Sequence, residues 1–201
     1  MLILVGKHLP GADHPNLGRL VTPRSRHGLA DTDGRMDWAC DNDAFAAWDH
    51  DRFVSMLEAV HDAPKTRLRF VACPDVVADW PATIQRFRDW YAAVRAVGPV
   101  AIVLQDGATA SSVPWDHIDA VFVGGSTEWK MGRDAEALIL EAKYLDKWVH
   151  VGRVNSWRRM KWARSLNVDS VDGTTWARFT DTYLWRDLAR LEHPHQPRLT
   201  G

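Results

Sequence analysis

The sequence predicts an α/β protein built as a single compact (β/α)8 barrel of the TIM type. Short apolar runs recur along the chain, and most are continuous rather than alternating, which is typical of strands covered on both faces. Helical patterns separate these runs, so the strands should be parallel. Seven or eight repeats favour a closed barrel, and a doubly wound open sheet remains the alternative. The 201 residues, 46% of them apolar, suffice for one full core at the lower end of barrel length.

Seven strands are clear from their apolar runs, and an eighth is expected near residues 19–23 (RLVTP). The clear strands cover residues 2–6, 37–40, 68–73, 100–104, 120–124, 148–152 and 168–172. Residues 7–36 are rich in Gly, Pro, His and Arg and form one long irregular stretch, which is usually functional or disordered in a small domain. The barrel should therefore span residues 1–192, followed by a frayed tail at 193–201.

Five helices are expected between and after these strands. Residues 51–62 carry apolar side chains at helical spacing, among them Phe53, Leu57 and Val60. The helix over 81–98 opens with Pro81 and closes on Gly98. The remaining helices cover residues 132–147, 155–167 and 176–192.

Composition narrows the class of protein. The 25 Lys and Arg balance 26 Asp and Glu, so the whole molecule is not a polycation that binds nucleic acid by its bulk field. Only Cys40 and Cys73 are present, which fits a reducing compartment and gives no disulfide framework. The apolar start is too short for a signal peptide, and no run approaches the roughly 18 residues of a membrane span. We expect a soluble cytoplasmic protein without a membrane partner.

Polar residues end almost every predicted strand. In a parallel barrel all these ends open on one rim, where active sites of this architecture lie. Any single one of them could instead be a helix N-cap or an Asx-turn. The residues concerned are Asp41 and Asp43, Asp75, Gln105 and Asp106, Gly124, Gly125 and Glu128, Arg153 and Asn155, and Asp172 with Gly173 and Thr174.

Two aspartates in the last strand should have different tasks. Asp169 lies three residues before Asp172, on the opposite strand face, and is expected to anchor a Lys or Arg of the barrel wall. Asp172, at the strand end and before a glycine, is the better candidate for a reacting carboxylate. Hard-metal binding by the acidic rim (Asp41, Asp43, Asp75 and Asp106) is the alternative. His150 lies inside a strand and is expected to be a core histidine, so we predict neither a metal nor a cofactor.

A local basic run provides a candidate nucleic-acid surface. Residues 143–164 contain seven Lys and Arg against one acid, with Trp148, Trp157 and Trp162 interleaved. The alternative is an ordinary solvated helix face. The candidate contact residues are Arg153, Asn155, Arg158, Arg159 and Lys161. The irregular stretch supplies a second set of cations: Lys7, Arg19, Arg24, Arg26 and Arg35.

The order of motifs resembles a known family. Over about residues 37–175 the succession ACDNDAF, ACPD, VLQDG, FVGGSTEW, HVGRVNS and VDSVDGT is similar to the queuine-type tRNA-guanine transglycosylase superfamily, and more closely to its shorter members that insert 7-deazaguanines into DNA. The family's G-x-D-x-x-D segment matches residues 167–172, with Asn167 in place of glycine. Its D-S-G-G-F motif matches residues 41–45 with both glycines replaced, which implies a differently shaped loop.

The resemblance implies a role for each matched residue. Asp172 is the implied nucleophile and Asp41 the implied general acid/base. Asp75 would hold the guanine-like edge of the base, with Gln105 beside it. The backbone of Gly124 and Gly125 would bind the base carbonyl, and Glu128 matches the glutamate just beyond.

The implied activity is exchange of guanine in DNA for a 7-deazaguanine such as preQ0, through a covalent aspartyl-glycosyl intermediate and without a cofactor. The tRNA enzymes carry a zinc site of several cysteines and a histidine, whereas this sequence has no Cys after Cys73, so we expect no zinc-binding subdomain and favour DNA. An RNA substrate, a metal-dependent barrel hydrolase and a non-catalytic nucleic-acid-binding barrel stay open. The expected partners are DNA and a free base, and a homodimer or an accessory protein is also open.

Overall fold

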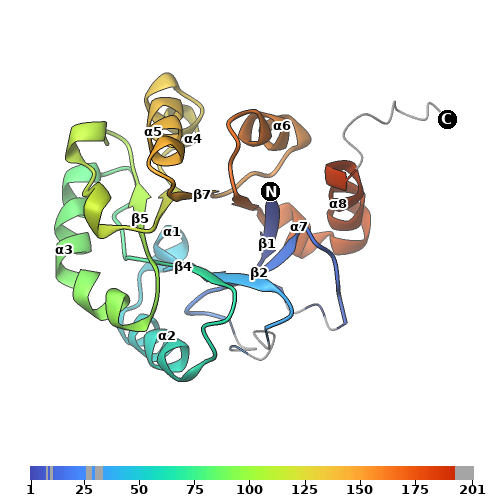
Figure 1. Cartoon of the computed structure of the whole chain (residues 1–201), viewed down its shortest axis with the longest axis horizontal. Coiled ribbons are helices and arrows are strands. Elements are labelled where there is room, and N and C mark those ends of the chain that lie inside the picture. The colour runs from blue at the N-terminus through green and yellow to red at the C-terminus, as the bar shows by residue number, and fades with distance from the viewer. Residues whose placement is uncertain (8, 10, 26–28, 30–33, 193–201) are drawn as a thin grey trace.

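Eight parallel strands close into a barrel in sequence order, β1 pairing with β8, in the computed structural model (Figure 1). The structure describes residues 1–7, 9, 11–25, 29 and 34–192, so the tail at 193–201 and Arg26 lie outside the described residues. The strands are β1 (Leu2–Val5), β2 (Leu17–Val21), β3 (Asp37–Cys40), β4 (Leu68–Ala72), β5 (Val100–Leu104), β6 (Ala120–Val123), β7 (Trp148–Val151) and β8 (Ser170–Asp172). The predicted barrel is confirmed, and the doubly wound alternative is wrong.

The helices surround this barrel, as Figure 1 shows. They are α1 (Ala44–Ala47), α2 (His50–Asp62), α3 (Trp80–Val97), α4 (Thr127–Lys130), α5 (Arg133–Tyr144), α6 (Trp157–Ser165), α7 (Thr174–Arg178) and α8 (Trp185–Glu192), with 3-10 turns at Ala110–Ser112 and Trp115–His117. Side chains of Asp49, Asp79 and Ser156 accept hydrogen bonds from backbone N–H groups at the starts of α2, α3 and α6. These caps satisfy backbone donors that have no partner inside the helix.

Several predicted boundaries need correction. The eighth strand is β2, which begins at Leu17 rather than residue 19 and divides the predicted irregular stretch 7–36. The strand predicted from residue 168 begins at Ser170. The helix predicted over 176–192 is three pieces, because a π-helical turn at Thr180–Leu184 separates α7 from α8. Local apolar spacing does not reveal such a change of helical register.

The core has two layers, one inside the barrel and one between the strands and the helices. Small and apolar side chains fill the barrel interior, including Leu4, Phe70, Val103 and Phe122, and a larger set packs between the strands and the helices. This double burial explains why the strand sequences are continuously apolar. Gly18 lies where a Cβ would be 2.4 Å from the Leu4 side chain, so only glycine fits between β1 and β3 there.

The end of the barrel where the strands begin is held by ion pairs and backbone contacts. Lys143 Nζ lies 2.8 Å from both carboxylate oxygens of Asp169, which confirms that Asp169 anchors a wall cation. Lys147 Nζ donates to the carbonyl of Ile118 at 2.9 Å. These contacts make Lys143 and Lys147 structural.

None of the helices in the described ranges combines the length and the apolar character that a membrane span needs.

Candidate active site

The opposite end of the barrel, where the strands finish, holds a cavity of about 270 Å³. Most of the residues predicted for the site from the sequence line it. These are Asp41, Asp75, Gln105, Gly124, Gly125, Arg153 and Asp172. Glu128, Asp106 and Asn155 do not line it, and Glu128 lies exposed in the first turn of α4. The strand ends therefore bring the carboxylates of Asp41, Asp75 and Asp172 to one space with the Gln105 amide and the Arg153 guanidinium, and Asp43 adds a fourth carboxylate.

Asp172 is held by two donors. The backbone N–H of Arg153 donates to Oδ1 at 3.1 Å, and His150 Nε2 lies 3.0 Å from Oδ2. His150 is completely buried in the barrel interior, 4.4 Å from the Phe122 ring by centroids. Gly152 is needed beside this carboxylate, because a Cβ there would lie 2.6 Å from Phe122 and 3.3 Å from Asp172 Oδ2.

A chain of hydrogen bonds continues behind His150. Trp148 Nε1 donates to Ser170 Oγ at 2.9 Å, and the same Oγ lies 2.9 Å from His150 Nδ1. Because an ionised carboxylate only accepts, His150 Nε2 is the donor to Asp172. His150 is thus more than the core histidine predicted from the sequence: it positions the candidate nucleophile.

Arg153 turns into the cavity instead of out to solvent. Its guanidinium donates to the carbonyl of Gly125 and lies 4.0 Å from the centre of the Phe45 ring. Its backbone is left-handed, with φ 59°, an uncommon conformation for a non-glycine residue. Burial lowers the pKa of Arg153, although the nearby carboxylate of Asp172 opposes this. Arg153, predicted as a nucleic-acid contact on the rim, therefore lies in the cavity itself.

Asp75, Gln105 and Asn42 form a buried polar network on the cavity wall. Asn42 Nδ2 donates to Asp75 Oδ1 at 2.8 Å, and Gln105 Nε2 donates to Oδ2 at 2.6 Å. Gln105 Oε1 accepts from the N–H groups of Ala78 (2.8 Å) and Gly125 (2.9 Å), which fixes the orientation of its amide. Burial raises the pKa of Asp75 to about 6, partly offset by the hydrogen bond from Asn42. Each carboxylate oxygen keeps a lone pair for a ligand.

The two glycines have a different task from the one the resemblance implied. The N–H of Gly124 donates to the carbonyl of Leu104, and that of Gly125 is taken by Gln105. Neither is available for a base carbonyl, and the donor that this wall offers to that group is the second N–H of Gln105 Nε2. Both glycines are required by space, since a Cβ on Gly124 would lie 2.7 Å from that amide nitrogen and one on Gly125, whose φ is 67°, 2.6 Å from Trp129.

Asp41 lies half-buried beside the other acids. Burial, followed by the negative charges of Asp172 and Asp75, raises the pKa of Asp41 to about 8. The carboxyl therefore holds a proton at neutral pH and can act as an acid. The N–H of Asn42 donates to Oδ1 at 2.7 Å and orients the group.

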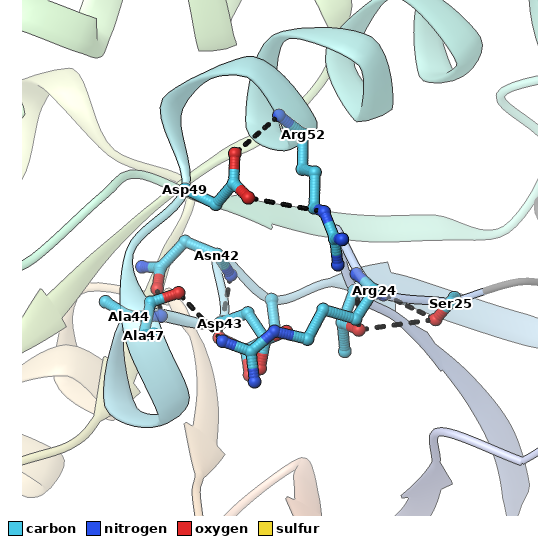
Figure 2. A network of polar contacts seen from close by, with 10 residues as sticks. Arg24, Ser25, Asn42, Asp43, Ala44, Ala47, Asp49 and Arg52 are labelled. Carbon is cyan, nitrogen blue, oxygen red and sulfur yellow. Dashed lines mark hydrogen bonds and ion pairs between the residues drawn. The ribbon is translucent and has the colours of Figure 1, made fainter.

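The loop that carries Asp41 is tied down from outside the cavity (Figure 2). Arg24 Nε lies 3.3 Å from Asp43 Oδ2, and its Nη2 donates to the carbonyl of Ala47 at 2.9 Å. Asp43 has a left-handed backbone with φ 62°, and so has Asn167 with φ 55°. Both stand where the resembled family has glycine, and Asp and Asn tolerate this conformation better than most residues. Losing glycine at these two positions therefore does not exclude a glycine-like backbone.

The predicted nucleic-acid surface is only partly available. Asn155 Oδ1 accepts from the hydroxyl groups of Thr174 and Thr175 at 3.4 Å and from the N–H of Thr175 at 3.3 Å, so Asn155 links the β7 and β8 ends. Arg159 is half-buried and donates to the carbonyl of Arg153 at 3.4 Å. Arg158 and Lys161 are exposed on α6. Trp148 and Trp162 are occupied by hydrogen bonds to Ser170 and Glu136.

Asp106 does not line the cavity, and Asp43, which does, is paired with Arg24. Asp106 accepts from the N–H and the hydroxyl of Ser126 at 2.7 and 2.6 Å and so fixes the start of α4. Among the residues that the structure describes, no three His, Cys, Asp or Glu side chains gather as a metal ion would require. The alternative hypothesis, a hard metal ion bound by the acidic rim, therefore has no ligand cluster among the described residues.

Sequence reasoning missed three contributors to the site. Asn42 follows Asp41 directly, and its place after a strand was a usable signal. Lys130 gave none: it is buried behind the cavity, its Nζ donates to the carbonyl of Gly152, and burial lowers its pKa to about 7. Phe45, an exposed ring at the cavity mouth, ends the matched motif at residues 41–45 but was given no role of its own.

Comparison with known proteins adds little to this geometry. No family model matches the chain, and no curated protein matches it. Among solved structures, one similar chain is described as "PaMucR Phosphodiesterase, c-di-GMP complex", with 14% sequence identity and a TM-score of 0.40. The match covers 73% of this chain and 63% of that one. A likeness at this level says nothing about chemistry.

Proposed function

We propose that this protein exchanges guanine in DNA for a free 7-deazaguanine base. The observation that carries the proposal is the convergence of Asp41, Asp75 and Asp172 on one cavity. At about 270 Å³ this cavity lies just below the roughly 300–1,000 Å³ of sites for drug-sized ligands, a size suited to a nucleobase with its sugar. The resemblance of the motif order to the enzymes that modify DNA favours DNA over RNA.

In the proposed mechanism Asp172 attacks C1′ of the target nucleotide. The glycosidic bond breaks as the carboxylate–C1′ bond forms, and the departing guanine takes a proton from Asp41. The incoming base then gives its ring N–H proton to Asp41, attacks C1′ and releases Asp172. One base replaces the other, and no other reactant is consumed. The raised pKa of Asp41, which keeps it protonated at neutral pH, supports its place as the acid of the first half.

The wall network has the polarity that a guanine-type edge needs. Such an edge presents N–H donors, which the acceptor-only carboxylate of Asp75 matches, and a carbonyl, which the free N–H of Gln105 matches. Because Gln105 Oε1 is tied to two backbone donors, its amide cannot turn to favour the opposite polarity without losing both bonds. This supports selection of guanine-like bases over adenine.

The test is incubation of the protein with a guanine-containing DNA and preQ0, followed by mass analysis of the nucleosides. The wild type should convert deoxyguanosine to the deazaguanine nucleoside, while Asp172→Asn should convert none and keep its thermal unfolding midpoint. Intact-mass analysis of the wild type with DNA should show a covalent adduct that the variant lacks. Exchange of unchanged rate in Asp172→Asn would refute the mechanism, and exchange with tRNA instead of DNA would move the substrate to RNA.

A further inference from the structure

A second hollow lies next to the cavity on the same rim. It has a volume of about 340 Å³ and lies between the residues that follow β7 and those that follow β8. Asn155 and Thr175 line this groove, whereas Thr174 lines the cavity. The Thr174 hydroxyl lies 3.4 Å from Asn155 Oδ1, so one pair of side chains separates the two spaces. A strand with one nucleotide in the cavity would therefore have a neighbouring nucleotide at this groove.

Aromatic rings and one arginine, Arg186, line the groove together. Phe179 is 54% exposed and meets Tyr183 edge to face at 5.8 Å between centroids. Arg186 lies over the Tyr183 ring at 4.6 Å, and Arg190 over the Trp157 ring at 5.1 Å. The π-helical turn Thr180–Leu184 spans this region and sets Phe179 and Tyr183 side by side. Such turns are rare and often mark functional places.

The charge of the groove suits a phosphate backbone. Arg186 and Arg190 share one buried carboxylate, that of Asp187, at 3.0 and 3.4 Å. Arg158 on α6 and Arg178 on α7 are exposed, and the acid on the π-helical turn is Asp181. On α6, α7, the π-helical turn and α8, basic side chains outnumber the acids Asp181, Asp187 and Glu192.

We propose that the groove binds the DNA strand beside the target nucleotide, with a base stacked on Phe179 and the phosphate near Arg186. This inference rests on the proposed function. Its physical reason is that extruding a nucleotide from the stack leaves its neighbours without a stacking partner. An aromatic face close to the cavity replaces that partner without selecting a sequence, because every base has a stacking face.

The experiment compares Phe179→Ala with a matched control, Tyr144→Ala. Tyr144 is 85% exposed at the C-terminal end of α5, at the opposite end of the barrel from the cavity. Binding of a fluorescent single-stranded oligodeoxynucleotide with one guanine is measured by anisotropy, and the KM values for DNA and for preQ0 are measured by exchange. Loss of one stacked base should weaken DNA binding by about 5-fold to 100-fold in Phe179→Ala and raise the KM for DNA accordingly. Tyr144→Ala should match the wild type, and Phe179→Trp should recover the binding.

Three outcomes would refute the proposed role of the groove. The first is that Phe179→Ala binds DNA as tightly as the wild type. The second is an equal rise in both KM values, which would indicate a general structural effect. A wild-type dimer that becomes monomeric in Phe179→Ala would assign the groove to contact between copies of this chain. Anisotropy does not depend on catalysis. If Phe179→Ala binds DNA more weakly but the wild type shows no exchange, the DNA-binding role of the groove stands and only the proposed function is refuted.

Discussion

Titration of the Asp41 carboxyl should lower the free energy of unfolding as pH rises. Its pKa is about 8 in the folded chain, against a usual value of 3.8. Between these values the folded state holds a proton that the unfolded chain has released. The free energy of unfolding therefore falls with rising pH through this interval, and the stability that this group gives below the unfolded pKa is lost as pH passes the folded pKa. Replacing Asp41 with Asn removes this titration and keeps an oxygen for the N–H of Asn42.

The magnitude follows from the interval. Each pH unit between the two pKa values is worth up to about 1.4 kcal/mol, so three units from pH 5 to pH 8 amount to at most about 4 kcal/mol. Because the side chain is partly exposed, water screens part of this, and we expect about 2 kcal/mol. Urea unfolding at pH 5 and pH 8 should show that the wild type loses about 2 kcal/mol more than Asp41→Asn between the two.

A matched control has the opposite sign. Burial would raise the pKa of Asp106 on the same rim, but hydrogen bonds from Ser126 outweigh it and lower the pKa. Its stabilising contribution is present above the unfolded pKa and is lost as pH falls, so Asp106→Asn should be less stable than the wild type at both pH values. If wild type and Asp41→Asn lose the same free energy from pH 5 to pH 8, Asp41 is not protonated at neutral pH, and its role as the acid fails.

Three further predictions concern activity. His150→Phe removes the donor that holds Asp172 and should lower the exchange rate constant about 10-fold to 100-fold. His150→Gln keeps a donor and should retain part of the rate. Equal rates in His150→Phe and wild type would exclude a positioning role. The pH profile of exchange should rise near pH 6 as Asp75 ionises and fall above pH 8 as Asp41 loses its proton, and a profile flat from pH 5 to pH 9 would contradict both assignments. Asp75→Asn should raise the KM for the free base about 10-fold or more, because a carboxylate acceptor becomes partly a donor; calorimetric titration of preQ0 would detect this, and unchanged affinity would place the base elsewhere.

The polar rim could be predicted from the sequence, but the hydrogen bonds within it could not. That Asp41, Asp75, Gln105 and Asp172 meet follows from parallel strands, whose carboxyl ends share one rim. Sequence could not show that the N–H groups of Gly124 and Gly125 are already engaged. Their acceptors lie on a neighbouring strand and on the wall amide, and such pairings depend on register. The prediction for Glu128 has another difficulty: the residue lies exposed in the first turn of α4 and does not line the cavity.

The sequence by itself determined the barrel, most strands and helices, the wall anchor at Asp169 and the order of polar residues at the strand ends. These depend on short-range physics: burial on both faces, helical spacing and end signals. Only the tertiary structure decided that Arg153 turns inward, that Asn155 links two loops and that His150 holds Asp172 through a chain beginning at Trp148. Each of these depends on which strand lies beside which, and on a closed interior where a polar group must find its partner across the barrel rather than along the chain.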